Sequence, residues 1–297
     1  IPVKVPEGQY LVMGDNRPDI RGEDAITPPA EFTRALDEAN LLDPDLVVLN
    51  GDLIAGYVHY KPRLKEMWDA FDLAVSRLKM PYYQVVGNHD VSSRAMQNVY
   101  AERYGKKFPL YYSFDHGGCR FIALDSDVDG EYDHIGKAQL EWLKKDLETA
   151  KEARKIFVFI HKPLWQFAES NWMRELHPLM AQYGVDTVFG GHFHQYYKDK
   201  TRDNVRYIVS GGAGAEIYFK DIAGGFFHFL TVTVRDKRAS IAVVRTGGVE
   251  NEDVVTSDFL NKAESLKSAL IPLSVRLERG ATAVPEKYGL VIANPFS

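Results

Sequence analysis

Five short polar blocks in the sequence carry side chains of the types that bind metal ions. They span residues 14–17 (GDNR), 50–52 (NGD), 87–90 (GNHD), 161–163 (HKP) and 190–194 (GGHFH). The possible ligands are two carboxylates, one amide and three imidazoles, namely Asp15, Asp52, Asn88, His161, His192 and His194. Such a mixed set of oxygen and nitrogen donors suits Mn, Fe, Zn or Co, whereas Ca and Mg sites consist mostly of oxygen.

Each polar block follows a short apolar run rich in β-branched and aromatic residues. The runs lie at 9–13, 46–49, 82–86, 156–160 and 187–189, and a sixth lies at 121–124. Runs of this kind are typical of strands that are buried on both faces. Because the carboxyl ends of strands in an open α/β sheet meet at one edge, blocks far apart in sequence can converge there. We therefore expect the five blocks to form one site.

Amphipathic stretches with apolar residues three or four positions apart separate the early strands. Their apolar stripes begin at Phe32, Leu64 and Leu140, which is the spacing of helices with one buried face. This alternation predicts a layered α/β domain with a largely parallel sheet over residues 9–190. From Gln195 onward, strand-like runs follow one another without helices, as in a meander that completes a second sheet or extends the first. A helix-like stretch is expected at 262–270.

The composition limits the class of protein and its partners. The chain has 297 residues, a formal net charge of −5 and a hydrophobic fraction of 45%, which is enough for a large core. No apolar run is long enough to span a membrane, and no basic cluster favours nucleic acid or anionic lipid. A single cysteine, Cys119, excludes an internal disulfide. Because the chain starts at Ile1, a removed signal peptide with a secreted or periplasmic location and a truncated cytoplasmic chain both stay open.

The order of the blocks resembles the calcineurin-like metallophosphoesterases. Their signature runs Asp-x-His, Gly-Asp, Gly-Asn-His-Asp/Glu, His and Gly-His-x-His; the resemblance covers residues 11–194, and four of the five blocks match fully. It implies an α/β fold in which a two-sheet sandwich is flanked by helices, in four layers α/β/β/α. We expect this domain at 1–245 and a C-terminal extension of unknown role, packed on the same domain, at 246–297. The resemblance leaves the oligomeric state open.

The resemblance also implies a set of metal ligands. Asp52 would be shared by two ions, with Asn88, His161 and His192 at the second site and Asp15 and His194 at the first. The implied cofactors are one or two divalent or trivalent ions, with Mn, Fe or Zn preferred. The implied reaction is the hydrolysis of a small phosphorylated substrate, a phosphomonoester or a phosphodiester, by a metal-bound hydroxide that attacks phosphorus. His89 would assist as a cation or acid facing the phosphate, oriented by Asp90.

Arg17 stands where the first block of the family has a histidine. A guanidinium stays protonated and has no lone pair, so it cannot replace an imidazole ligand. Three interpretations follow. In the first, the first site keeps its ion, with water or Asn16 as a substitute ligand, and Arg17 binds the substrate phosphate. In the second, Arg17 pairs with Asp15 and replaces the ion. A third interpretation is a non-catalytic binding or scaffold protein that retains the fold with an impaired first site.

Aromatic and acidic residues near the blocks are weaker candidates. Tyr57 and His59 follow the second block and Trp165 follows the fourth, where they could stack on an organic leaving group or simply pack their loops. Asp125 and Asp127 follow the run at 121–124 and could reach the edge of the site, but we expect them to be surface carboxylates. Four further histidines match no block and are expected to be structural, namely His116, His134, His177 and His228.

Overall fold

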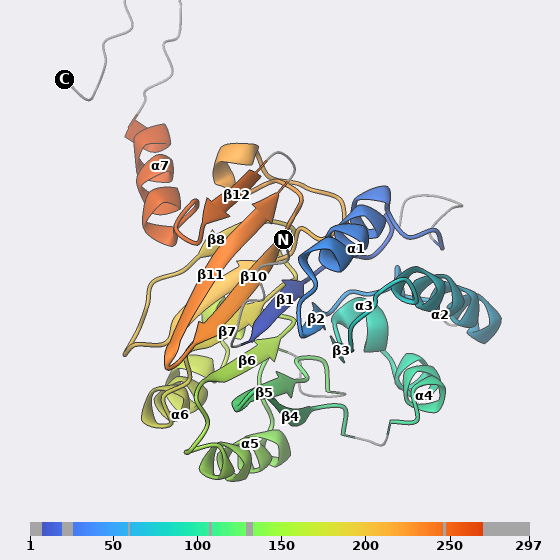
Figure 1. The fold of residues 1–297 in the computed structure, drawn as a ribbon, viewed down its shortest axis with the longest axis horizontal. Helices are drawn as coiled ribbons and strands as arrows, with labels where there is room; N and C mark the ends of the chain where they lie inside the picture. Colours follow the sequence, from blue (N-terminus) through green and yellow to red (C-terminus); the bar gives the residue numbers. More distant parts are fainter. Residues whose placement is uncertain are drawn as a thin grey trace, which may run out of the picture. The chain divides into compact units, whose positions relative to one another are not determined.

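Two mixed β-sheets form the framework of the protein (Figure 1). The structure, a computed structural model, describes residues 8–19, 26–58, 60–106, 109–128, 133–245 and 248–269. The chain divides into one compact unit up to Leu260 and a second from Asn261 onward. The sheets and the candidate site belong to the first unit.

Sheet A has the strand order β12-β11-β10-β1-β2-β3. Its parallel half consists of β1 (Gln9–Met13), β2 (Leu46–Asn50) and β3 (Tyr82–Val85). Its antiparallel half consists of β10 (His228–Arg235), β11 (Arg238–Arg245) and β12 (Gly248–Asn251). Sheet B has the order β4-β5-β6-β7-β9-β8. Its parallel centre consists of β5 (Cys119–Leu124), β6 (Ile156–Ile160), β7 (Thr187–Gly190) and β9 (Arg206–Ser210), with antiparallel β4 (Tyr112–His116) and β8 (Tyr196–Lys198) at the edges.

Helices cover the outer faces of both sheets. The α-helices are α1 (Ala30–Leu42), α2 (Lys61–Val75), α3 (Asn88–Val91), α4 (Arg94–Arg103), α5 (Lys137–Thr149), α6 (His177–Gln182) and α7 (Ser257–Ala269). Short 3₁₀ or π segments are η1 (Leu164–Gln166), η2 (Trp172–Leu176) and η3 (Asp221–Ala223). In Figure 1, α1, α2 and α4 lie beside β1 to β3, and α5 and α6 lie beside β5 and β6.

Alternating side chains of β1 show how the layers are held together. Leu11 and Met13 point outward into a cluster with Phe32 of α1 and Trp68 of α2. Tyr10 points inward, and its ring meets that of Phe121 in β5 edge to face at 4.9 Å. The inner faces of the two sheets therefore share one apolar core, and the helices add a layer on each side. This four-layer arrangement is the expected fold class.

The sequence located most of the framework. All six predicted strands between residues 9 and 189 are confirmed, and so are the helices at the three apolar stripes. The prediction of one largely parallel sheet over residues 9–190 is wrong, because β1 to β3 and β5 to β7 lie in different sheets. For the strands after Gln195, the sequence left open whether they complete a second sheet or extend the first. Both occur, because β9 joins sheet B while β10 and β11 extend sheet A. The stretch expected at 262–270 is helical from Ser257 to Ala269.

Two further predictions concern membrane-spanning segments and the domain boundary. Among the described residues, no helix is both long and apolar enough to cross a membrane. Strand β12 lies beyond residue 245 and pairs with β11. The domain boundary at 245 and the extension at 246–297 stay predictions.

Candidate metal centre

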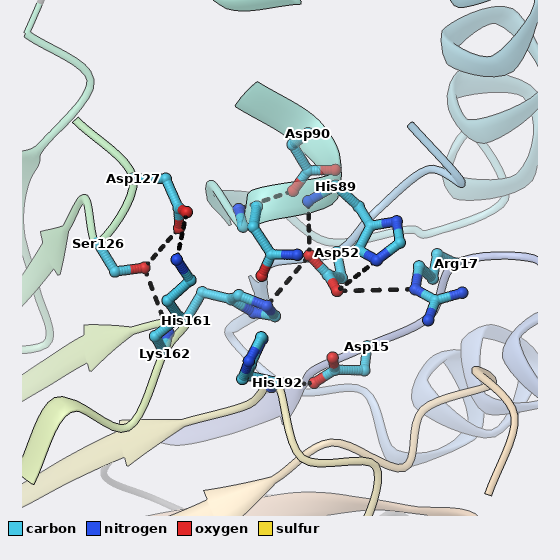
Figure 2. Close-up of polar contacts among 12 residues, drawn as sticks. Asp15, Arg17, Asp52, His89, Asp90, Ser126, Asp127, His161, Lys162 and His192 are labelled. Atoms are coloured by element: carbon cyan, nitrogen blue, oxygen red, sulfur yellow. Dashed lines mark hydrogen bonds and ion pairs between the residues drawn. The ribbon is translucent and has the colours of Figure 1, made fainter. Parts of the chain in front are cut away.

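Six side chains from the polar blocks lie at the carboxyl ends of strands from both sheets. Figure 2 shows four of them together, Asp15, Asp52, His161 and His192. Sheet A contributes Asp15, Asp52 and Asn88, which follow β1, β2 and β3. Sheet B contributes His161, which follows β6, and His192 and His194, which follow β7. The single site expected from the sequence is therefore present as a geometric cluster.

Two groups of three side chains within this cluster could each hold a metal ion. One group is Asp52, His161 and His192, and the other is Asp15, Asp52 and His194. Within each group, one ligand atom per residue lies within 4.8 Å of the others. Asp52 belongs to both groups, as the family resemblance implies. That these atoms bind metal stays a prediction.

The backbone is strained at three of these residues. The φ angles of Asp15, Asp52 and His192 are 57°, 54° and 68°, a region that residues other than glycine rarely adopt. Strain of this kind costs ~1–3 kcal/mol per residue and is concentrated at functional sites. The packing is also tight, because a Cβ added to Gly51 would lie 2.3 Å from Nδ1 of His161.

The Asp52 carboxylate lies at the middle of the cluster. Its Oδ1 accepts a hydrogen bond from the backbone N–H of His89 at 3.0 Å and lies 3.1 Å from Nε2 of His161. Burial alone would raise the pKa of Asp52. The positive charge of His161, aided by His89, outweighs burial and holds that pKa well below its usual range. Asp52 is therefore ionised at neutral pH.

Burial and the charges of neighbouring groups set the protonation of the metal-free cluster. Burial, with a further contribution from the charge of Asp52, raises the pKa of Asp15 to about 7. His161 is fully buried, which opposes its protonation, but the carboxylates of Asp52 and Asp15 raise its pKa to about 10. His161 thus holds a proton at neutral pH, and a metal ion bound there would displace it.

The other two histidines are uncharged. Burial, together with the positive charge of His161, lowers the pKa of His192 to about 3. Burial likewise lowers the pKa of His194 to about 4. Nδ1–H of His194 donates to the carbonyl of Glu216, which leaves Nε2 toward Asp15, 3.5 Å from its Oδ1. A neutral imidazole with one nitrogen held in this way is the form that binds metal.

Two buried oxygens of candidate ligands have no hydrogen-bond partner among the described residues. They are Oδ1 of Asp15 and Oδ1 of Asn88. Buried polar atoms without partners are rare in folded proteins because each forfeits the hydrogen bonds that it makes with water. Both oxygens have lone pairs available for a cation, and Nε2 of His161 gains one when His161 loses its proton. The donor set therefore fits divalent metal ions.

Arg17 pairs with Asp52, whereas the second interpretation had named Asp15 as its partner. Its Nε lies 3.6 Å from Oδ2 of Asp52, and the side chain is nearly buried. His89 approaches the same oxygen, with its Nε2 at 3.8 Å. Figure 2 shows both side chains on one side of Asp52. Two cationic or proton-donating groups thus face one location beside the cluster.

Asp90, expected to orient His89, does not touch the His89 ring. Nδ1–H of His89 donates to the carbonyl of Ala55 at 2.6 Å. Asp90 instead accepts backbone N–H groups, from Leu53 at its Oδ1 and from Gly87 at its Oδ2, both at 2.8 Å. Burial, strengthened by the charge of Asp52, raises the pKa of Asp90 to about 8. Asp90 therefore positions the backbone around His89 and does not touch its ring.

Asp125 and Asp127 are buried, so the expectation of surface carboxylates is wrong. Oδ1 of Asp127 pairs with Nζ of Lys162 at 2.8 Å, and this ion pair offsets the cost of burial. The backbone N–H of Lys162 also donates to Oγ of Ser126 at 3.3 Å. The residue after His161 is therefore tied to the end of β5.

The structure separates the weaker aromatic candidates. The hydroxyl of Tyr57 accepts a hydrogen bond from Nδ2 of Asn88 at 2.7 Å, so Tyr57 borders the cluster. Trp165 does not, because its ring is buried in the core and packs against Tyr207 with centroids 5.0 Å apart. His59 lies outside the described residues.

Sequence reasoning missed the segment after β9. Backbone N–H groups of Ala213 and Ala215 donate to the carbonyls of Gly14 and Asp15, at 2.9 and 2.8 Å. The segment continues to Glu216, whose carbonyl holds His194. The only signal in the sequence is the run of small residues at 211–215 (GGAGA), which permits such close approach.

Comparison with known families agrees with this geometry. The sequence model described as "Calcineurin-like phosphoesterase" matches residues 11–196, which contain all five blocks. The chain belongs to the calcineurin-like phosphoesterase family. Membership of this family implies divalent metal ions at the site.

Curated members of the calcineurin-like phosphoesterase family share part of their length with this chain. Purple acid phosphatase 23 of Arabidopsis thaliana is 30% identical over 207 residues, covering 55% of this chain and 44% of that protein. Tartrate-resistant acid phosphatase type 5 of Homo sapiens is 27% identical over 184 residues, covering 51% of this chain and 56% of that protein. The chain thus spans about half the length of these relatives.

Solved structures with the calcineurin-like phosphoesterase fold superpose on both sheets. Purple acid phosphatase PPD1 from yellow lupin (Lupinus luteus) has a TM-score of 0.64 at 18% identity, over 82% of this chain and 52% of that one. GAP50, the anchor in the inner membrane complex of Plasmodium, has a TM-score of 0.63 at 14% identity, over 88% of this chain and 94% of that one. At these identities the likeness shows the fold, which confirms the predicted fold class.

Proposed function

We propose that this protein hydrolyses phosphoric esters at a two-metal centre. The observation that carries the proposal is the pair of ligand groups that share Asp52, together with the unpartnered buried oxygens of Asp15 and Asn88. Asn88, His161 and His192 would hold one ion with Asp52, and Asp15 and His194 would hold the other. Divalent ions bound there would polarise the phosphoryl group and lower the pKa of water toward neutrality. The mixed oxygen and nitrogen donors favour Mn, Fe or Zn.

Arg17 would bind the phosphoryl group of the substrate. Its guanidinium lies beside Oδ2 of Asp52, and its fork of N–H donors matches the geometry of phosphate oxygens. The first ion would keep three protein ligands, Asp15, Asp52 and His194, because Arg17 cannot ligate. We therefore favour two ions with Arg17 facing the substrate over one ion replaced by Arg17.

His89 would hold a proton for the leaving group. Its Nδ1–H is committed to the Ala55 carbonyl, so any transferable proton sits on Nε2. Burial lowers the pKa of His89, which favours the neutral ring while no substrate is bound. The negative charge of an arriving phosphate would favour the protonated ring. Nε2–H would then donate to the ester oxygen as the bond to phosphorus breaks.

A non-catalytic binding or scaffold protein is the alternative. GAP50, the anchor in the inner membrane complex of Plasmodium, has the same fold. Replacement of a family ligand by Arg17 favours this alternative, whereas the unpartnered atoms of Asp15 and Asn88 favour a working metal centre. Only a measurement of turnover separates the two.

The test is hydrolysis of p-nitrophenyl phosphate and bis(p-nitrophenyl) phosphate by the purified protein with Mn²⁺, Fe²⁺ or Zn²⁺, beside metal analysis. We expect two equivalents of metal per chain and turnover of at least one ester, whose identity assigns monoesterase or diesterase activity. Asp52→Asn should lower kcat/KM at least about a hundredfold, ~2.7 kcal/mol of transition-state stabilisation. The exposed Asp37→Asn is the matched control and should retain activity. Bound metal without turnover would favour the scaffold, and no bound metal would overturn the metal centre.

A further inference from the structure

The segment at 53–57 follows the backbone and side chains of the short helix α3 along its whole length. The backbone N–H groups of Leu53 and Ile54 donate to Oδ1 of Asp90 at 2.8 and 3.3 Å. The carbonyl of Ala55 accepts from His89, as described above. A Cβ added to Gly56 would lie 1.6 Å from the carbonyl oxygen of His89. Each residue of the segment thus touches α3, and Tyr57 completes the series at Asn88.

Tyr57 reaches Asn88 at a cost in backbone conformation. Its φ angle is 53°, a left-handed value that is unfavourable for a tyrosine. The side chain is also 54% exposed, so burial of apolar surface does not account for its placement. Its hydroxyl accepts the Nδ2–H of Asn88 at 2.7 Å, and its ring meets the ring of His89 with centroids 4.5 Å apart. Strain held in place at an exposed residue indicates a role in the site.

The hydrogen bond to Tyr57 holds the Asn88 amide with Nδ2 toward the hydroxyl and leaves Oδ1 as the free end of the amide. An amide can ligate a cation only through its oxygen, because its nitrogen carries two hydrogens and no available lone pair. With Nδ2 held by Tyr57, the oxygen Oδ1 is buried and has no hydrogen-bond partner among the described residues. If the amide rotated, Nδ2 would face the cation and the ligand would be lost.

We propose that Tyr57 is a positioning residue for metal binding, which fixes the Asn88 amide so that its oxygen faces the ion held with Asp52, His161 and His192. The inference rests on the proposed function, because it assumes that Asn88 is a ligand. It assigns Tyr57 a role through Asn88, in place of the stacking on a leaving group that the sequence suggested. Groups that orient metal ligands in this way typically contribute tenfold to hundredfold to metal affinity.

The test is a titration of the purified metal-free chain with Mn²⁺ by isothermal calorimetry. Tyr57→Phe keeps the ring and the backbone conformation and removes only the hydroxyl. We expect the Kd of one of the two ions to rise about tenfold or more, while the other stays within about twofold. Tyr60→Phe is the matched control, since Tyr60 is a neighbouring tyrosine that is 69% exposed, and its two Kd values should equal those of the wild type.

A double-mutant cycle assigns the effect to the amide. Asn88→Asp replaces the amide by a carboxylate, either oxygen of which can ligate, so no orientation needs to be fixed. In that background Tyr57→Phe should change the affected Kd less than about twofold. Tyr57→Gly should bind Mn²⁺ as weakly as Tyr57→Phe while its melting temperature stays at or above that of the wild type, because glycine relieves the strained φ.

The outcomes separate this inference from the proposed function. If the wild type binds two Mn²⁺ ions and Tyr57→Phe binds them equally well, the positioning role is overturned and the proposed function stands. An equal loss of affinity in both the Asn88 and the Asn88→Asp backgrounds would also overturn it, because the hydroxyl would then act by another route. If the wild type binds no Mn²⁺, the proposed function itself fails.

Discussion

Nε of Arg17 lies 3.6 Å from Oδ2 of Asp52, in a site where both side chains are almost wholly buried. A buried arginine is stable only where negative charge compensates it, and Asp52 supplies that charge while the site is free. Asp52 is also the carboxylate shared by both ligand groups. If ions bound Asp52 as proposed, the guanidinium would need a new anion, which a phosphate ester would provide.

Replacement of Arg17 should therefore weaken substrate binding more than metal binding. For Arg17→Met we expect KM for an aryl phosphate to rise at least about tenfold, ~1.4 kcal/mol of lost binding, with two equivalents of metal still bound. Arg17→Lys keeps the charge but lacks the planar fork, so its KM should lie between those of the wild type and Arg17→Met. The measurements are steady-state kinetics and metal analysis on the same preparations.

The control for Arg17 is an exposed arginine. Arg174 is 75% exposed at its side chain, and Arg174→Met should leave KM unchanged. An Arg17→Met protein with wild-type KM and only one bound ion would contradict the assignment, because Arg17 would then support the first metal site.

The blocks that form the site could be located from the sequence because each follows a short apolar run that forms a strand. A run such as Ile156–Ile160 has few alternatives to a buried strand, and the end of that strand fixes the position of His161. Chain topology then brings five such ends together, and no side-chain detail is needed to foresee it. This explains why the ligand cluster was predicted, although most of its members are more than 30 residues apart.

The contacts around the ligands could not be foreseen, since they depend on loop conformations that periodic patterns do not encode. The hydrogen bond from Asn88 to Tyr57 requires positive φ at both Gly56 and Tyr57. Asp127 is buried against Lys162, with which it forms an ion pair. The sequence does not reveal this pairing, so the general preference of aspartate for the surface gave the wrong prediction. Backbone carbonyls such as that of Ala55 carry no side-chain signal at all.

A pair of glycines with the same φ tests the packing of the segment at 53–57. Gly56 and Gly105 both have a φ of 59°, but a Cβ at Gly56 would collide with the His89 carbonyl, whereas a Cβ at Gly105 meets no described atom within 4 Å. Gly105→Ala should therefore cost only the strain of φ, about 1 kcal/mol of unfolding free energy. Gly56→Ala should cost clearly more, about 3 kcal/mol, because backbone must shift. Urea unfolding measures both, and equal costs would contradict the packing.

Binding of metal should stabilise the fold, since the cluster joins strand ends of both sheets. At a free metal concentration of 100 times Kd, mass action adds about 2.7 kcal/mol for one site. For a chain of 297 residues, that corresponds to a rise of ~4 °C in melting temperature. Differential scanning fluorimetry with chelator and with Mn²⁺ measures the shift. Asp52→Asn should lose most of it, and an undiminished shift in that variant would place the stabilising ion elsewhere.

His228 should make the protein less stable in acid, independently of the metal centre. It is buried at the start of β10, where its Nδ1–H donates to the Phe226 carbonyl at 2.9 Å and its Nε2 accepts from Oγ–H of Ser210 at 3.1 Å. A second proton on Nε2 would break the bond from Ser210. Burial, with a smaller contribution from the charge of Arg245, lowers the pKa of His228 from 6.5 to about 4.

The sign follows from proton binding. Between pH 6.5 and pH 4 the unfolded chain binds a proton at His228 that the folded chain excludes, so stability is complete above pH 6.5 and falls as the pH falls. From pH 7 to pH 5 the loss is about 2 kcal/mol, at ~1.4 kcal/mol per unit below 6.5. His228→Gln cannot titrate, so with chelator present its unfolding free energy should drop about 2 kcal/mol less than that of the wild type over the same range. Urea unfolding at pH 7 and pH 5 compares the two proteins, and an equal drop in both would show that His228 is protonated in the fold.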